Sequence, residues 1–384
     1  MLKEVCYLTA LLLIFTACGN PGSIKTDSEQ AYAVLVPGSG TYSRKISTHS
    51  PQAQAFFDQG LRLAWSFYFP ESIASFQEAS RIDPDHPMPF WGMAYAMGPN
   101  PNSRYARMPD DPKGEGLKAI NNALGRIDRA NPLEAKLIRA LYVLYDQQTI
   151  PNQDDRDRAY LTAMRILNQE YPDDPDITAL YAASYMSMKR WDYWDSEGNP
   201  KAETIPVAEA LEHIIAQGLS HPGVFHLHIH LIEASLEPER ALVSADALEA
   251  TVPIAGHVVH MPSHIYVRVG KYGKAVENNV RSQEVDRQFT DLWGDYPLPN
   301  IGTYPLSHRL HAGHALDFIR YAATVQGNYK TASEAAWRMA NRVIGDTVMV
   351  QGGQKRVSAP WLVLKIFGKW DELLALTPAY QGTP

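Results

Sequence analysis

The sequence predicts an all-α protein built from antiparallel helical hairpins, and three observations support this class. Apolar residues recur at helical spacing along the chain from residue 51 onward. Proline and glycine turn signals divide that part into segments of helix length. A pair of histidines, His226 and His230, recurs 34 residues later as His260 and His264. A fixed period of this length is typical of stacked helix pairs that form a solenoid.

The first residues, 1–17, are predicted to be a bacterial lipoprotein signal peptide. Lys3 supplies a basic start, the run LTALLLIF is apolar, and the letters FTAC ending at Cys18 resemble a lipobox. The apolar run is too short to span a bilayer as a permanent helix. Acyl chains on Cys18 would anchor the mature chain in the bacterial cell envelope, on the periplasmic side of the inner membrane or at the outer membrane. An ordinary secretory signal is the alternative.

The composition limits the partners and the metal ligands. The segment 18–50 is rich in Gly, Ser, Asn and Pro, so we expect a flexible tether before the helical body, 51–384. The net charge is −7 and no basic run occurs, which predicts no binding to nucleic acid. The only cysteines are Cys6 and Cys18. Any metal in the body must therefore be bound by His, Asp, Glu or Tyr.

The hairpins follow one another along the body. The first covers 54–84, where apolar residues recur at helical spacing and Pro70 opens a second helix at its first turn. The segment MPFWGMAYAMGPN begins the next hairpin. Two hairpins contain the repeated histidines. Further hairpins are predicted at 159–186, 310–343 and 360–376, and ordered loops rich in Trp, Tyr, Pro and Gly at 191–205 and 289–304.

Several of these segments resemble the tetratricopeptide repeat family. The residues that carry the resemblance in the first hairpin and the start of the next are Gly60, Phe76, Ala79, Pro84, Trp91 and Gly92. A second copy contains Gly270, Tyr272, Ala275 and Ser282, and Ser72 stands where the family usually has alanine. The resemblance implies a right-handed solenoid of about seven or eight antiparallel helix pairs. It also implies that the first helix of each pair lines a concave groove that binds peptides or proteins.

The repeated histidines are expected on one surface. On a helix, His226, His230 and Glu233 are spaced to form one stripe. His257, His260 and His264 form a second stripe. His228 points away from the first stripe, so we expect a hydrogen-bonded core histidine there. Stacking of neighbouring first helices would place the two stripes side by side.

A third helix joins this surface when the turn glycines Gly270 and Gly327 are aligned. The alignment places His314 one turn nearer the helix start than Asp317, with His311 close by. It predicts two layers across the three helices. One layer would hold His226, His260 and Asp317, and the next would hold His230, His264 and Tyr321.

This mixture of imidazoles and carboxylates predicts a transition-metal site for Zn, Cu or Fe. Clustered neutral imidazoles need partners for both ring nitrogens, and a metal ion accepts one lone pair from each. The predicted ligands are His226, His230, His257, His260, His264, His311 and His314. If the site is catalytic, Glu233 or Asp317 is the candidate general base, and Tyr266 or Tyr321 a hydrogen-bond donor. The sequence names no reaction or substrate.

Two other interpretations stay open: a metal-free groove that binds a peptide, a protein or a small molecule, and histidines with a structural role only. HLHIH lacks the glutamate of HExxH, and no GxSxG or phosphate-binding loop occurs. The paired HxxxH helices are similar to coupled binuclear copper proteins in spacing alone. Two local conflicts remain. The letters HLHIH alternate as in a strand, and Pro262 predicts a kink or a helix that begins near Met261.

Overall fold

The computed structural model describes residues 31–99, 112–299, 307–342 and 353–376. The predicted signal peptide and Cys18 lie outside these ranges. Helices dominate the described residues, whose extended structure is a single isolated bridge between Trp194 and Pro200. The predicted all-α class of paired helices is therefore confirmed. None of the helices in the described ranges combines the length and the apolar character needed to cross a membrane.

Seven helices form the first part of the array. They are α1 (Pro51–Trp65), α2 (Phe69–Ile82), α3 (Pro87–Met97), α4 (Pro112–Leu124), α5 (Pro132–Tyr145), α6 (Gln153–Glu170) and α7 (Pro175–Lys189). Most of them begin with proline, whose missing N–H costs nothing in the first turn. The side chains of Ser50, Asn131 and Asp174 accept hydrogen bonds from the exposed N–H groups at three of these starts. Local sequence thus marks where most of these helices begin.

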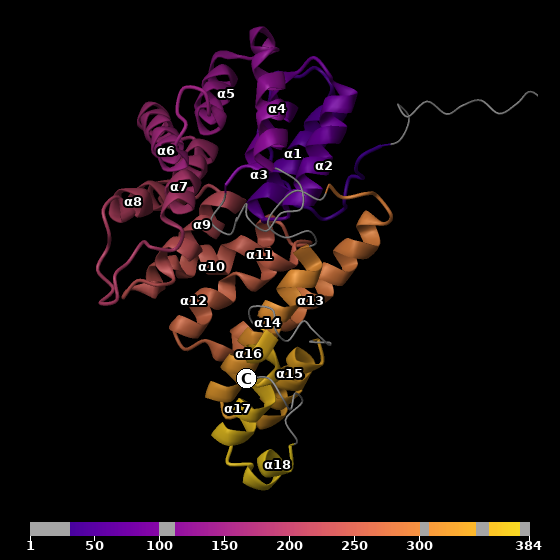
Figure 1. Cartoon of the computed structure of the whole chain (residues 1–384), viewed down its shortest axis with the longest axis vertical. Coiled ribbons are helices and arrows are strands. Elements are labelled where there is room, and N and C mark those ends of the chain that lie inside the picture. The colour runs from indigo at the N-terminus through magenta and orange to yellow at the C-terminus, as the bar shows by residue number, and fades with distance from the viewer. Residues whose placement is uncertain (1–30, 100–111, 300–306, 343–352, 377–384) are drawn as a thin grey trace, which may run out of the picture. The chain divides into compact units, whose positions relative to one another are not determined.

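The remaining helices continue the array. They are α8 (Thr204–Ala216), α9 (Pro222–Ile232), α10 (Leu242–Leu248), α11 (Gly256–His260), α12 (Pro262–Arg268), α13 (Tyr272–Trp293), α14 (Ser307–Val325), α15 (Tyr329–Asn341), α16 (Gly353–Val357), α17 (Ala359–Ile366) and α18 (Trp370–Ala375). Neighbours in sequence pack as pairs, which can be followed by colour in Figure 1. The hairpins predicted from the sequence correspond to α1–α2, α6–α7, α14–α15 and α17–α18.

Close packing of α1, α2 and α3 depends on two glycines. A Cβ atom at Gly60 would lie 2.6 Å from the ring of Phe76, and one at Gly92 would lie 2.5 Å from it. The ring therefore occupies a notch that only glycine leaves open. These are residues on which the resemblance to tetratricopeptide repeats rests.

The structure resolves the two local conflicts around the histidines. His226–His230 lies within the helix α9, so the strand alternative is wrong. The α11 helix ends at His260, and Pro262 opens α12 after a helical Met261 with φ −54° and ψ −38°. A helix that begins near Met261 is one of the two outcomes predicted for this proline, the other being a kink.

Two predicted boundaries are wrong. The loop expected from residue 289 begins only after Trp293, because Phe289 and Trp293 are buried and stack with centroids 5.8 Å apart on the last turns of α13. Gly294, with φ 67°, then ends the helix. The tether predicted over 18–50 is also wrong for the residues from 32 onward. In that segment Val36 and Ile46 are buried, although its Gly/Ser content indicated flexibility.

The segment 32–50 is fastened to distant helices by polar contacts as well. Arg44 pairs with Asp174 at 3.0 Å and with Asp176 at 2.7 Å. The Ser47 hydroxyl donates to the Glu134 carboxylate at 2.6 Å. The segment is therefore a packed part of the helical body.

The turn between α1 and α2 reaches helices far along the chain. The Tyr68 hydroxyl donates to the Asp286 carboxylate in α13 and accepts from the Gly256 N–H at 2.9 Å. The Trp65 carbonyl accepts from the His226 ring at 2.5 Å. This turn consequently packs against the helices that carry the histidines.

Candidate metal centre

Six of the seven predicted histidine ligands gather where α9, α11, α12 and α14 meet. They form two groups of three, within each of which one ring nitrogen per residue lies within 4.8 Å of the others. The inner trio is His226, His230 and His257. The outer trio is His260, His264 and His314. The side chain of His311 lies outside the described residues.

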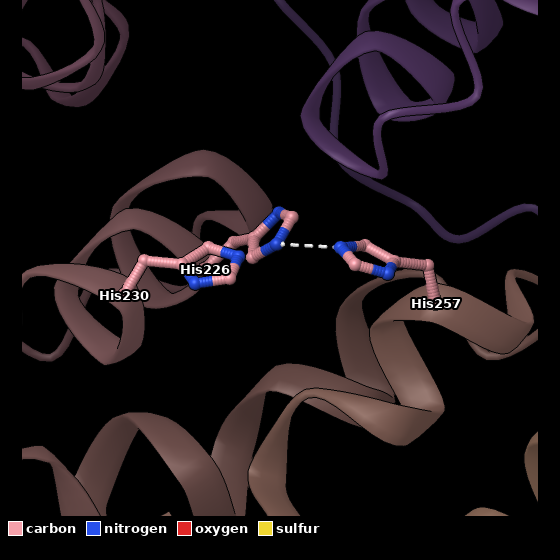
Figure 2. Close-up of side chains that lie close together, drawn as sticks. All are labelled: His226, His230 and His257. Atoms are coloured by element: carbon pink, nitrogen blue, oxygen red, sulfur yellow. Dashed lines mark hydrogen bonds between the residues drawn. The ribbon is translucent and has the colours of Figure 1, made fainter. Parts of the chain in front are cut away.

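The inner trio is enclosed by protein. Its members have exposed fractions of 0%, 3% and 4% for His226, His230 and His257. Figure 2 shows the two α9 rings facing the ring of His257 across the gap between helices. The Nε2 atoms of His226 and His257 are 3.1 Å apart, and the rings of His226 and His230 are centred 4.9 Å apart. Two helices thus direct three imidazoles at one small volume.

The outer trio lies at the edge of the same cluster. The Nε2 atoms of His260 and His264 are 2.9 Å apart, and the ring of His314 is centred 4.8 Å from that of His260. His260 is buried, His264 is partly buried and His314 is exposed. The depth of the rings therefore decreases from α11 toward α14.

A carboxylate connects the two trios. Glu233, directly after α9, accepts from His230 Nδ1 with one oxygen at 2.9 Å and from His264 Nδ1 with the other. A carboxylate only accepts hydrogen bonds when ionised, so both Nδ1 atoms carry the proton. Both rings are consequently held with Nε2 directed into the cluster.

Other acceptors hold two more rings in the same way. The His226 Nδ1 faces the Trp65 carbonyl oxygen, which can only accept. The His260 Nδ1 lies 2.6 Å from the Asn279 side-chain oxygen. The orientation of that amide is fixed because its nitrogen donates to the Ala275 carbonyl at 2.7 Å. Four imidazoles thus donate through Nδ1 and keep a lone pair on Nε2.

Lone pairs that face each other require a cation between them. The Nε2 atoms of His260 and His264 are within hydrogen-bond distance, yet each ring already has its proton on Nδ1. The Nε2 atom of His230 is buried and has no hydrogen-bond partner among the residues that the structure describes. A proton or a metal ion satisfies such an arrangement, and the metal ion can accept several lone pairs at once.

The surroundings favour a neutral His230 beside an ionised Glu233. Burial lowers the pKa of His230. Burial alone would raise the pKa of Glu233, but the imidazoles of His264 and His230 hold it well below its usual range. These are the protonation states that a metal ion needs in its ligands and their supports.

Three aromatic rings enclose the trios, and sequence reasoning missed all three in this role. Phe67, in the α1–α2 turn, is centred 4.3 Å from His226 and 5.5 Å from His257. Trp191 is centred 4.9 Å from His230. Phe318 is centred 4.9 Å from His260. Helical periodicity gives no signal for these contacts, because Phe67 lies in a turn and Trp191 lies in a loop.

Phe67 also has an unusual backbone. Its φ is 60°, in the left-handed region that large side chains rarely adopt. Such strain persists only where the surroundings impose it, and it is common at functional sites. Here the conformation directs the ring of a distant hairpin onto the inner trio.

The predicted neighbours His230 and His264 lie side by side, with ring centres 5.6 Å apart, but the register of the other layer is wrong. His226 faces His257, one turn earlier than the predicted His260, because α11 ends and α12 restarts at Pro262. Asp317 does not join the histidines, because its carboxylate accepts from Arg320 at 2.6 Å and from Lys355 at 2.5 Å.

The remaining candidates are placed away from the trios. Tyr266 donates to Asp246 at 2.6 Å, and the side chain of Tyr321 is exposed. Neither is placed as the predicted donor. His228 bonds the Ser244 hydroxyl at 2.9 Å and is buried, as predicted for a core histidine.

The fold and the site define an all-α protein of paired helices with clustered histidines. No family model and no curated protein matches the sequence. Among solved structures, the chain is similar to the human IFIT1 dimer with PPP-AAAA, at 13% identity and a TM-score of 0.37, covering 84% of this chain and 70% of that one. It is also similar to Naa15/Naa10 bound to HypK-THB, at 12% identity and a TM-score of 0.25, covering 85% and 53%. The chain thus spans about half the length of the latter.

Proposed function

We propose that this protein binds transition-metal ions through its histidine cluster. The observation that carries the proposal is the direction of the ring nitrogens. His230 and His264 donate through Nδ1 to one carboxylate and aim Nε2 into the cluster, where His264 Nε2 faces that of His260. The lone pairs that meet there are the groups that a metal ion would take up.

The chemistry of the donors favours Zn²⁺, Cu²⁺ or Fe²⁺. Imidazole suits these ions, whereas Ca²⁺ and Mg²⁺ prefer oxygen ligands. The Glu233 carboxylate fits the usual support of a metal-bound histidine, an acceptor on the nitrogen that does not face the metal. A bound ion would supply Lewis acidity, and a coordination position left open would accept a small ligand.

The two predicted general bases have other roles in this arrangement. Both oxygens of Glu233 accept from histidine rings, and Asp317 is paired with Arg320 and Lys355. We therefore infer that Glu233 positions the ligands. The function that the geometry supports best is metal binding, in storage, transfer or as part of a reaction centre.

Metal analysis of the purified protein tests this proposal. The untagged chain is loaded separately with Zn²⁺, Cu²⁺ and anaerobic Fe²⁺, desalted, and counted by mass spectrometry. We expect at least one tightly bound ion per chain for one of the three metals. A His264→Ala variant should lose bound metal, whereas His213→Ala, at an exposed histidine paired with Asp173, should retain it. Wild-type chain that stays metal-free in all three loadings overturns the proposal.

A second candidate is a metal-free scaffold that binds peptides or proteins. Exposed apolar side chains along α17 and α18 favour it, since Ile366, Trp370 and Leu374 are 53%, 56% and 83% exposed. A scaffold function predicts a partner that binds in a fixed ratio to the chain. Leu374→Asp should abolish this binding, and replacement of the outer histidines should leave it unchanged.

We also propose a location in the bacterial cell envelope, anchored by lipid on Cys18. The support is the signal-like sequence before this cysteine. Cell fractionation tests it, because Cys18→Ser should move the protein from the membrane fraction to the soluble fraction. A distribution that the substitution leaves unchanged contradicts the anchor.

A further inference from the structure

We propose that the cluster holds two metal ions, one in the inner trio and one in the outer trio. This inference rests on the proposed metal binding and specifies its number and arrangement. The two trios share no residue, and each brings three imidazole nitrogens together within 4.8 Å. A single tetrahedral ion takes four ligands, so six converging imidazoles exceed what one ion uses.

The trios are adjacent but separate. The closest ring nitrogens belong to the same trio. The Nε2 atoms of His226 and His257 are 3.1 Å apart in the inner trio, and those of His260 and His264 are 2.9 Å apart in the outer trio. Each trio therefore brings its own nitrogens together, and each ion would have three ligands.

Glu233 supports both sites at once. One of its oxygens holds a ring of the inner trio, His230, and the other holds a ring of the outer trio, His264. The competing arrangement places one ion between these three residues, which also form a candidate group. That ion would have to replace the two Nδ1 hydrogen bonds that hold His230 and His264 on Glu233.

The two sites differ in access to solvent. Phe67 covers the inner trio, whose three rings are buried. The outer trio includes the exposed His314. We expect the inner ion to leave slowly and the outer ion to exchange readily. The fourth position of the outer ion would be available to water or a small ligand.

Metal stoichiometry distinguishes this inference from the function on which it rests. The whole untagged chain is loaded with Zn²⁺, and in a parallel series with Cu²⁺, then desalted and counted. Two ions per chain are expected with at least one of the two metals, and one after His314→Ala, which changes an exposed side chain. One ion per chain in the wild type overturns the two-ion arrangement and leaves metal binding intact. No ion in either series overturns the two-ion arrangement, and metal binding itself is overturned only if the Fe²⁺ loading also leaves the chain metal-free.

Glu233→Gln provides a second test. If Glu233 supports ligands of both ions, both ions should remain in the variant but bind about 10–100-fold more weakly. If Glu233 is itself a ligand of a single ion, the variant should lose that ion completely, which overturns the inference. Glu237→Gln is the matched control, because that carboxylate is 67% exposed and lies 3.7 Å from Arg240.

The rate of metal release tests the difference in depth. Excess chelator should remove one equivalent rapidly and the second slowly from the wild type, and the rapid equivalent should be absent from His314→Ala. Two equivalents that leave at one rate contradict an enclosed inner site. Circular dichroism confirms that each variant is folded, and wild-type stoichiometry and release rates decide the question without any variant.

Discussion

The Nε2 atoms of His260 and His264 lie 2.9 Å apart, although both rings have their Nδ1 protons directed elsewhere. His260 is the last residue of α11, and His264 is in α12. Two neutral rings in this geometry present lone pairs to each other, which is unfavourable without a cation. A proton on one of the two Nε2 atoms, or a metal ion bound by both, removes this repulsion.

Metal should therefore raise the stability of the folded chain. At a free Zn²⁺ concentration 100 times the dissociation constant, one site contributes about 2.7 kcal/mol. Thermal unfolding followed by circular dichroism, with and without Zn²⁺, measures the effect. His264→Ala should show a smaller shift than His213→Ala, because it removes a ligand of the outer trio. Equal shifts in the two variants would place the metal elsewhere.

Metal affinity of the inner trio should change little between pH 8 and pH 6. Protons compete with metal only when the imidazoles are protonated, and burial lowers the pKa of His230. The loss of affinity should therefore occur at more acidic pH than for histidines near 6.5. Calorimetric titration at several pH values checks this. A tenfold loss already between pH 8 and pH 7 contradicts it.

Asp286 should make stability fall as the pH rises toward neutrality. Burial raises its pKa from 3.8 to about 7. The folded state thus holds a proton that the unfolded state releases, so its contribution is complete below about pH 3.8 and is lost as the pH rises through 7. Relative to Asp286→Asn, the wild type should lose up to about 4 kcal/mol over this range. Urea unfolding from pH 4 to pH 8 measures the difference. Parallel pH profiles would contradict the raised pKa.

Phe67 combines a strained backbone with a buried ring, and two substitutions separate these effects. Phe67→Ala should destabilise the fold by about 3–5 kcal/mol through lost packing. Phe67→Gly should be about 1 kcal/mol less destabilising than Phe67→Ala, because glycine adopts φ 60° without strain. Urea unfolding of both variants tests the order. Chelator should also remove the inner ion faster from both.

Periodicity was sufficient to predict the class of fold and the meeting of the histidines. The 34-residue recurrence brings His230 and His264 to rings 5.6 Å apart. The register between His226 and the α11–α12 helices was not predictable in this way, because a turn-glycine alignment assumes unbroken helices and Pro262 divides this one.

The surroundings of the site were less accessible to sequence reasoning. Glu233 was predicted as a ligand partner or base, but only the folded geometry shows both its oxygens on rings of different trios. Phe67 reaches the cluster through a left-handed turn and long-range packing, neither of which leaves a periodic pattern. Segment 32–50 was predicted to be a flexible tether because its overall content of Gly, Ser, Asn and Pro is high. That content hides single apolar residues such as Val36 and Ile46, which are buried.

The α1–α2 turn changes how this array should come apart. In most repeat proteins each unit touches only its neighbours, so the ends can fray while the middle stays intact. Here Trp65 and Tyr68 form hydrogen bonds with residues as distant as His226 and Asp286, so the first hairpin is bound directly to helices far along the chain. Opening the first hairpin would uncover the inner histidines. Local unfolding of the first hairpin would then release an ion bound by the inner trio, so the two processes would have the same rate.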